Sequence, residues 1–354
     1  MIAFCLALAC LCLPATAETL RLVTWNVELE RRGPGLLLRD ILRDTDPQIA
    51  TIAEVVARLA PDILLLQEVD HDRDLHAMRA LRDRLARDGP HYPHILALRP
   101  NSGLYSGRDM DGDGRCCDAR DAQGYGAFSG QGGMALLSRY PIDRDAVQDF
   151  SALLWRDLPG ALLPVRDDGT PFPSAEARSA QRLSYTGHWV VPLMLPDGPL
   201  TLMVFHATPP VFDGPEDANG RRNHDELRFW QHFLDGAFGP APQARFVLMG
   251  DANLDPNDSD GRRGAIRALL ADPRLQDPRP MRRGPAALAP GKSGDPRLHT
   301  VDWPPPGPGP LRVSYILPSR DLRVSDAGVH WPLTEESAPA ASRHRPVWVD
   351  LAMP

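Results

Sequence analysis

The chain has 354 residues, of which 24% are charged and 43% hydrophobic, and its formal net charge is −7. These values are typical of a globular protein and exclude collagen-like, coiled-coil and mainly disordered chains. The mild acidity argues against a general nucleic-acid coat protein, which needs a basic face, but it allows an enzyme that meets phosphate through a bound cation.

The N-terminus has the features of a secretory signal. Residues 2–13 are almost wholly apolar, and a small-residue cleavage pattern ends at Ala17. The apolar run is too short to span a bilayer. We therefore expect a signal peptide at 1–17, a single mature domain at 18–354, and export to the periplasm or the medium.

Cysteine usage agrees with export. Removal of the signal would leave Cys116 and Cys117, an adjacent pair that cannot staple distant segments, so the core must hold the fold together. Whether this pair is bonded stays open. Lipidation at Cys10 or Cys12 is the alternative way of processing the N-terminus.

Hydrophobic periodicity predicts alternating strands and helices after the signal. In chain order we expect a strand at 20–27, a helix at 48–59, a strand at 62–68, a helix at 75–85, a long Gly- and Asp-rich loop at 99–132 and a strand at 133–138. There follow a hairpin with strands at 189–195 and 200–206, a helix at 221–234, a strand at 245–250, a loop or lid at 272–310, and strands at 312–317, 322–329 and 347–351. No repeat and no composition shift marks a second domain, so we expect one α+β domain.

Four of the expected strands end in polar residues directly after their apolar runs. These are Asn26, Glu68, His206, and Asp251 with Asn253. A carboxylate or imidazole at the end of a buried strand costs free energy unless it is paired or binds a metal, so four such ends predict one shared site. Oxygen ligands without cysteine suit a hard cation such as Mg²⁺ or Ca²⁺, and a hard cation beside histidines indicates phosphate ester chemistry.

Six motifs in order resemble those of the endonuclease/exonuclease/phosphatase superfamily, which includes pancreatic deoxyribonuclease, apurinic endonucleases, neutral sphingomyelinases and inositol polyphosphate phosphatases. They are Thr24–Val27, Leu66–Val69, Gly133–Ile142, Phe205–Pro209, Gly250–Asn253 and Ser342–Pro346. The resemblance covers residues 20–352. It implies an α+β fold, a four-layered α/β/β/α sandwich of two packed mixed sheets with outer helices.

The resemblance implies a role for each oxygen-bearing residue. Asn26 and Glu68 would bind the metal, which we expect to be Mg²⁺ or Mn²⁺. Asp251 and Asn253 would position the attacking water and contact the scissile phosphate. The implied reaction is in-line attack of water on phosphorus, without a covalent enzyme intermediate.

The resemblance also assigns two histidines. His206 would act as general acid or phosphate ligand, and His344 as general base or transition-state stabiliser. A third histidine, His188, directly precedes an apolar strand, and we expect it to line the cleft and bind substrate.

Two positions depart from the family pattern. Ser314 stands where the family usually has the aspartate that orients a catalytic histidine, and Arg343 where it usually has an aspartate that helps at the metal. Loss of an orienting group weakens catalysis without abolishing it. We expect Arg343 to bind the substrate phosphate, or Asp302 to supply a compensating carboxylate.

The loop at 99–132 contains aspartates at alternate positions, as in the first half of an EF-hand calcium loop. They are Asp109, Asp111 and Asp113. Arg120 replaces the glutamate of the twelfth position, although Asp118 or Asp121 could complete the site. A structural Ca²⁺ site and a plain acidic surface loop both stay open.

The sequence therefore predicts an exported, divalent-metal-dependent phosphoric ester hydrolase, with a slight preference for phosphodiesterase or nuclease activity. Its substrate would be a nucleic acid, a phospholipid head group or a small phosphate ester. We expect a monomer without a transmembrane segment. The alternative is a non-catalytic metal- or phosphate-binding protein on the same scaffold; Ser314 and Arg343 favour it, and the retained histidines and acidic pair oppose it.

Overall fold

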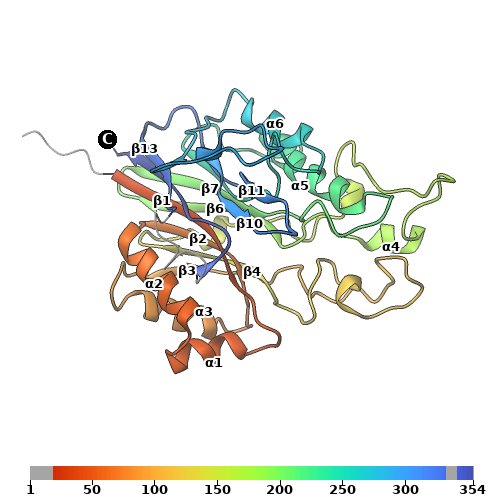
Figure 1. Ribbon diagram of the computed structural model, residues 1–354, viewed down its shortest axis with the longest axis horizontal. Helices are drawn as coiled ribbons and strands as arrows, with labels where there is room; N and C mark the ends of the chain where they lie inside the picture. The colour runs from red at the N-terminus through yellow and green to blue at the C-terminus, as the bar shows by residue number, and fades with distance from the viewer. Residues whose placement is uncertain (1–18, 332–340, 354) are drawn as a thin grey trace, which may run out of the picture.

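The computed structural model describes residues 19–331 and 341–353. The expected signal peptide at 1–17 lies outside the described residues. Strands occupy the middle of the molecule, with α1–α3 on one side and α5 and α6 on the opposite side (Figure 1). Within the described ranges, no helix has the length and apolar character needed to cross a membrane.

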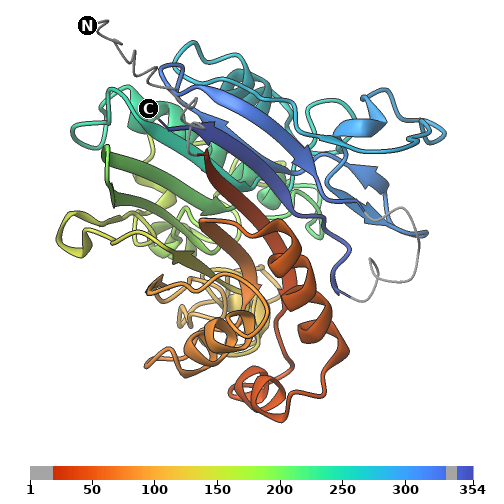
Figure 2. The same cartoon turned by 90° about the vertical axis from the view of Figure 1, so that its left-hand side faces the viewer.

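The first sheet has seven strands. Their order is β3 (His94–Leu96), β4 (Gly133–Ser138), β2 (Ile63–Val69), β1 (Thr19–Leu29), β14 (Val347–Ala352), β13 (Val324–Val329) and β9 (Met281–Arg282). β1 pairs in parallel with β2 and antiparallel with β14, so the sheet is mixed. Figure 2 shows β1, in red, beside the blue C-terminal strands, so the first and last strands of the described chain are neighbours.

The second sheet has five strands. Their order is β12 (Ser314–Pro318), β8 (Phe246–Asp251), β7 (Gly198–His206), β6 (Gly187–Leu195) and β5 (Gln148–Asp149). The expected hairpin is present as β6 and β7, while β7 and β8 run in parallel. A separate antiparallel pair is formed by β10 (Val301–Trp303) and β11 (Gly309–Leu311).

The period of two in each strand divides its side chains between two cores. In β2, Ile63 and Leu65 belong to the core between the sheets, and Leu64 and Leu66 belong to the core beneath the helices. All four side chains are fully buried, as expected of a central strand covered on both faces.

Helices cover the outer face of each sheet. The first sheet carries α1 (Leu36–Arg43), α2 (Pro47–Leu59) and α3 (His76–Leu85), and the second carries α5 (Ala218–Leu234) and α6 (Gly264–Leu270). The short α4 (Ala175–Ala180) and the 3₁₀ turns η1 (Ala119–Asp121), η2 (Arg144–Ala146), η3 (Trp155–Asp157) and η4 (Pro296–Leu298) lie in the connections. The four-layered α/β/β/α sandwich predicted from the motifs is thus confirmed.

The long connections contain more structure than the sequence predicted. The expected loop or lid at 272–310 includes η4 and β10, and the loop at 99–132 includes η1. Cys116 and Cys117 form a vicinal disulfide, which answers the question that their spacing left open.

Candidate active site

Both sheets and the C-terminal segment contribute to one cluster of polar side chains. The cluster contains all six residues to which the motifs assign metal binding or catalysis: Asn26, Glu68, His206, Asp251, Asn253 and His344. Asn26 donates a hydrogen bond to Asp251 Oδ2 at 3.2 Å, which joins the first sheet to the second. The Nε2 atom of His206 lies 4.0 Å from Glu68 Oε1 and 3.3 Å from Asn253 Nδ2.

A β-bulge directs Glu68 into the site. The register of β1 and β2 pairs Asn26 with Gln67 and Leu29 with Val69, so two residues of β1 lie opposite Glu68 alone. Glu68 has φ 56°, in the left-handed region that a residue with a side chain rarely adopts. A bulge re-aims a side chain next to an active site, and this local strain indicates a functional constraint.

The surroundings of Glu68 disfavour its ionised form in the absence of a cation. Burial raises its pKa to about 8, the hydrogen bond from Asn26 opposes this rise, and the charges of Glu30, Glu28 and Asp251 add to it. A divalent cation would reverse the repulsion and favour the ionised form. Glu68 and Asn26 supply the oxygen donors that Mg²⁺ or Mn²⁺ prefers, so the residues present fit the metal that the sequence predicts.

Glu28 belongs to the site although sequence reasoning missed it. Its carboxylate accepts hydrogen bonds from Ser342 Oγ at 2.9 Å and from the amide and guanidinium of Arg343, both at 2.7 Å. Burial alone would raise the pKa of Glu28, but Arg343 brings it below its ordinary value. The only sequence signal was its place two residues after Asn26.

His206 is buried and has a contact at each ring nitrogen. Thr186 Oγ1 lies 3.2 Å from Nδ1, and Asn253 Nδ2 lies 3.3 Å from Nε2. Burial lowers the pKa of His206 to about 4, and the charge of Asp251 only partly opposes this. The ring is therefore neutral at pH 7.

His344 is buried too, but it is less well paired. Its Nδ1 lies 3.4 Å from Asp251 Oδ2 and has no hydrogen-bond partner among the described residues. Ser314, opposite Asp251 in the register of β12 and β8, has a buried Oγ that equally lacks a partner in the described part of the chain. Burial lowers the pKa of His344, against the opposing charges of Asp251 and Glu28.

Helix α5 fixes the turns that follow His206 and Asp251. Asn223 Nδ2 donates to the carbonyls of Thr208 and Ala252, which adjoin the β7 and β8 ends. The carboxylate of Glu226 accepts from the amides of Thr208 and Tyr185, both at 2.6 Å. These buried contacts hold His206 and Asp251 at a fixed separation.

The expectation that His188 binds substrate is wrong. The side chain is fully buried, with Nδ1 bonded to Ser184 Oγ and Nε2 to the Glu226 carbonyl. The rings of Phe229 and Trp230 lie against it at centroid distances of 4.9 and 5.2 Å. On β6 this residue faces the core beneath α5, because its apolar neighbours place that face inward.

The two residues expected to offset the departures lie in different surroundings. Arg343 pairs with Glu28 while 57% of its side chain is exposed, so its role toward substrate stays a prediction. The carboxylates whose charge acts on His344 are those of Asp251 and Glu28. Asp302 adjoins the same segment, because its amide donates to the Arg343 carbonyl at 3.1 Å, but its carboxylate is not among the charges that act on His344. Glu28 is therefore the better candidate for the compensating carboxylate.

The acidic loop gathers three carboxylates. Oxygens of Asp109, Asp111 and Asp121 lie within 4.8 Å of one another. Asp113 is outside this group and accepts instead from the amide of Arg115 at 2.7 Å. A structural Ca²⁺ site stays a prediction, with Asp121 in place of Asp113.

Comparison with known proteins agrees with the resemblance seen in the six motifs. The model of the endonuclease/exonuclease/phosphatase family matches residues 23–344. An endonuclease/exonuclease/phosphatase from Beutenbergia cavernae DSM 12333 is 19% identical with TM-score 0.56, over 95% of this chain and 72% of that one. A family protein from Leptotrichia buccalis C-1013-b is 16% identical with TM-score 0.53, over 94% and 100% of the two chains.

A third solved structure, sphingomyelinase C from Streptomyces griseocarneus, is 17% identical with TM-score 0.50, over 94% of this chain and 99% of that one. At such identities the likeness concerns the fold alone. Among curated proteins no sequence matches significantly.

Proposed function

Because the chain belongs to the endonuclease/exonuclease/phosphatase family, as its motifs predicted, we propose that it is a divalent-metal-dependent phosphoesterase with a preference for phosphodiesters. Members of this family are generally phosphoric ester hydrolases. The observation that carries the proposal is the meeting of both sheets at one polar cluster, where Asn26 of β1 bonds Asp251 of β8 and His206 of β7 approaches Glu68 of β2.

The metal side of the site is formed by the first sheet. Glu68 and Asn26 would hold Mg²⁺ or Mn²⁺, which would offset negative charge on the phosphate oxygens. The surrounding carboxylates also repel an anionic substrate unless a cation is bound. A cation held by Glu68 and Asn26 would offset this charge and favour binding of the phosphate.

The second sheet supplies the groups that handle the attacking water. Asp251 is fully buried, and its Oδ1 accepts the amide of Asn253 at 3.0 Å, which fixes the carboxylate next to His344. A neutral His344 can accept a proton from water. His206 is neutral in the free protein, and the charge of a bound phosphate raises its pKa and favours proton donation or a hydrogen bond to phosphate.

The preference for a diester rests on the sequence around His206, which resembles the secreted deoxyribonuclease branch. A net charge of −7 offers no general basic face, which favours small or nonspecific contacts over sequence-selective binding of nucleic acid. A nucleic acid, a phospholipid head group and a small diester are therefore separate arms of the test.

Export as a monomer is part of the same proposal. The apolar N-terminus with its cleavage pattern at Ala17 supports export, and so does the disulfide between Cys116 and Cys117, because disulfides persist in oxidising compartments. The carboxylates of the 109–121 loop support a structural Ca²⁺ ion.

A non-catalytic binding protein is the second candidate. It is favoured by the unpartnered Ser314 Oγ and His344 Nδ1 and by the engagement of Arg343 with Glu28. Both features follow from the loss of two aspartates that the family usually has.

Hydrolysis assays on the purified protein test the proposal. The substrates are bis(p-nitrophenyl) phosphate, p-nitrophenyl phosphate, plasmid DNA and sphingomyelin vesicles, each with EDTA, Mg²⁺, Mn²⁺ or Ca²⁺. We expect turnover with Mg²⁺ or Mn²⁺ that EDTA and Glu68→Gln abolish and that Glu54→Gln, on the exposed face of α2, retains. Metal binding by calorimetry without turnover on any substrate would favour the binding protein, and absence of metal binding would refute the site assignment.

A further inference from the structure

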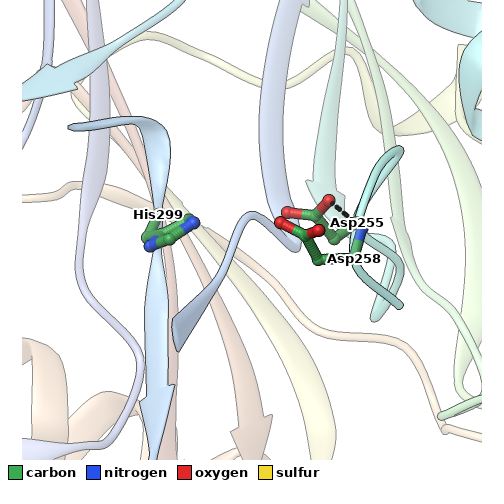
Figure 3. A group of neighbouring side chains, drawn as sticks. All are labelled: Asp255, Asp258 and His299. Carbon is green, nitrogen blue, oxygen red and sulfur yellow. Dashed lines mark hydrogen bonds between the residues drawn. The ribbon is translucent and has the colours of Figure 1, made fainter. Parts of the chain in front are cut away.

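A second group of metal-type ligands lies outside the catalytic cluster. Asp255 and Asp258 belong to the loop between β8 and α6, and His299 follows η4. One carboxylate oxygen of each aspartate and one ring nitrogen of His299 all lie within 4.8 Å of one another. Figure 3 shows the ring of His299 pointing toward the two carboxylates, which come from a different part of the chain.

His299 supplies an independent sign of a ligand. Its side chain is only 3% exposed, and its Nε2 has no hydrogen-bond partner among the described residues. A ring nitrogen buried without a partner costs free energy unless something binds it. Burial also lowers the pKa of His299, which favours the uncharged ring whose lone pair a metal uses.

Backbone N–H groups, and not His299, hold the two carboxylates in place. The donors are the amides of Asn257, Asp258 and Arg312 for Asp255, and those of Ser293 and Gly294 for Asp258. All five distances fall between 2.7 and 2.9 Å. Each ionised carboxylate has about four lone-pair sites, so both aspartates can bind an ion without losing these contacts.

This cluster is separate from the catalytic one. The group contains none of the six residues of the catalytic cluster, and none of those six lines the pocket beside it. Asp255 and His299 instead line a pocket of their own of about 270 Å³, which has room for a cation and its water ligands.

We propose that a first-row divalent cation binds between Asp255, Asp258 and His299 and stabilises the turn that carries Asn253. Zn²⁺ matches this donor set best. Two carboxylate oxygens and one imidazole nitrogen form a donor set for Zn²⁺ or Mn²⁺, in contrast to the all-oxygen set that Mg²⁺ and Ca²⁺ prefer. Zn²⁺ outranks Mn²⁺ at such sites, and water completes its coordination.

The ion would connect two segments of the catalytic site. Asp255 follows Asn253 by two residues, and His299 precedes Val301 by two residues. Val301 forms a β-bridge with His344. A cation held by Asp255 and His299 therefore ties the turn that carries Asn253 to the segment that carries His344, and stabilises the fold whatever ester the site cleaves.

Calorimetric titration with ZnCl₂ in saturating Mg²⁺ tests the assignment. A Glu68→Gln background removes a catalytic metal ligand, so that Zn²⁺ uptake there does not obscure the second site. We expect one Zn²⁺ per chain, a rise in Tm on binding, and the absorption bands of an imidazole-ligated ion when Co²⁺ replaces Zn²⁺. His299→Gln and Asp258→Asn are each expected to weaken Zn²⁺ binding by about tenfold or more.

His91→Gln and Asp260→Asn, at exposed positions, are the matched controls and are expected to bind Zn²⁺ normally. Circular dichroism checks that each variant is folded, and Asp258→Asn, on a half-buried loop residue, keeps the test valid if His299→Gln does not fold. The proposal is overturned if the Glu68→Gln protein binds no Zn²⁺, or if both ligand variants bind it as tightly as the controls. Either result leaves the proposed hydrolase activity untouched.

Discussion

The two sides of the catalytic cluster, one around His206 and the other around His344, differ in how completely their polar groups are paired. Each ring nitrogen of His206 has a partner, Thr186 at 3.2 Å and Asn253 at 3.3 Å. The Nδ1 of His344 has no hydrogen bond in the described part of the chain and lies 3.4 Å from Asp251 Oδ2, and the Oγ of Ser314 has no hydrogen bond there either. Both histidines are buried, so the difference lies in their partners and not in their access to water.

We attribute the difference to Ser314, which stands where the family usually has the aspartate that orients a catalytic histidine. A carboxylate at this position would accept the imidazole N–H, fix the tautomer and stabilise the imidazolium, whereas the shorter serine leaves Nδ1 without a hydrogen bond. His206 is therefore pre-organised, and His344 must be oriented by Asp251, the metal or the substrate. We infer that catalysis in this chain depends more on His206 than on His344.

The largest effect is expected when the histidine on each side of the cluster is substituted in turn. Because His206 is already in place, His206→Gln is expected to lower kcat by about 10³-fold, and His344→Gln by only about tenfold. Steady-state kinetics on a diester substrate with Mg²⁺ measure both. Equal losses in the two variants, with unchanged Tm, would show that pairing in the free protein does not determine each histidine's contribution.

Ser314→Asp is expected to reduce the difference between the two sides. A carboxylate beside His344 favours the protonated ring, so the pKa of His344 should rise and kcat should increase by about tenfold. The pH profile of kcat and the NMR titration of the ring measure these changes. Ser314→Asn, similar in size but without charge, is the control, and an equal gain in both variants would indicate packing as the cause.

A variant at Arg343 tests whether this residue has taken over a role on the His344 side from the aspartate that the family usually has there. Removal of its exposed guanidinium leaves Glu28 without its main partner and takes a positive charge away from the metal site. Arg343→Ala is therefore expected to lower kcat/KM by about tenfold, and Asp302→Ala to change it less than about twofold. The reverse order of effects would restore Asp302 as the compensating carboxylate.

Much of the site could be predicted because its residues end regular strands. Hydrophobic periodicity locates β2 and β8, and a polar residue at the end of each run costs too much free energy to be incidental. Parallel neighbours in a sheet then bring such ends together, as β7 and β8 do for His206 and Asp251.

The remaining features depend on contacts that periodicity does not encode. Glu28 enters the site through a bulge, which shifts the register that a period of two assumes. His188 had a strand-end position like that of His206, but aromatic side chains of α5 cover it. The proposed ligands Asp255 and His299 come from loops far apart in the sequence, and although Asp255 closely follows the Gly250–Asn253 motif, no pattern in the sequence links it to His299.

The smallest expected effect is the change of stability with pH. Glu68 and the two buried histidines contribute to it in opposite directions. The pKa of Glu68 is about 8 in the folded protein and 4.5 by its ordinary value, so between pH 6.5 and 8 the folded metal-free protein holds a proton that the unfolded chain has lost. Its free energy of unfolding therefore falls as pH rises through this window. Below pH 6.5 the buried histidines act in the opposite direction, because the folded pKa of His206, about 4, is lower than its unfolded value.

Mg²⁺ binds the ionised carboxylate, so the rise in Tm that Mg²⁺ causes is expected to grow from pH 6.5 to pH 8. Thermal unfolding with and without saturating Mg²⁺ measures it. Glu226, whose pKa is raised by burial to about 7, titrates in the same window but has no oxygen at the metal, so its contribution is the same with and without Mg²⁺. The matched Glu68→Gln protein should show neither the pH-dependent Mg²⁺ effect nor the steeper loss of stability. A Mg²⁺ effect that is constant across this pH range would mean that Glu68 is not the carboxylate that the ion must deprotonate.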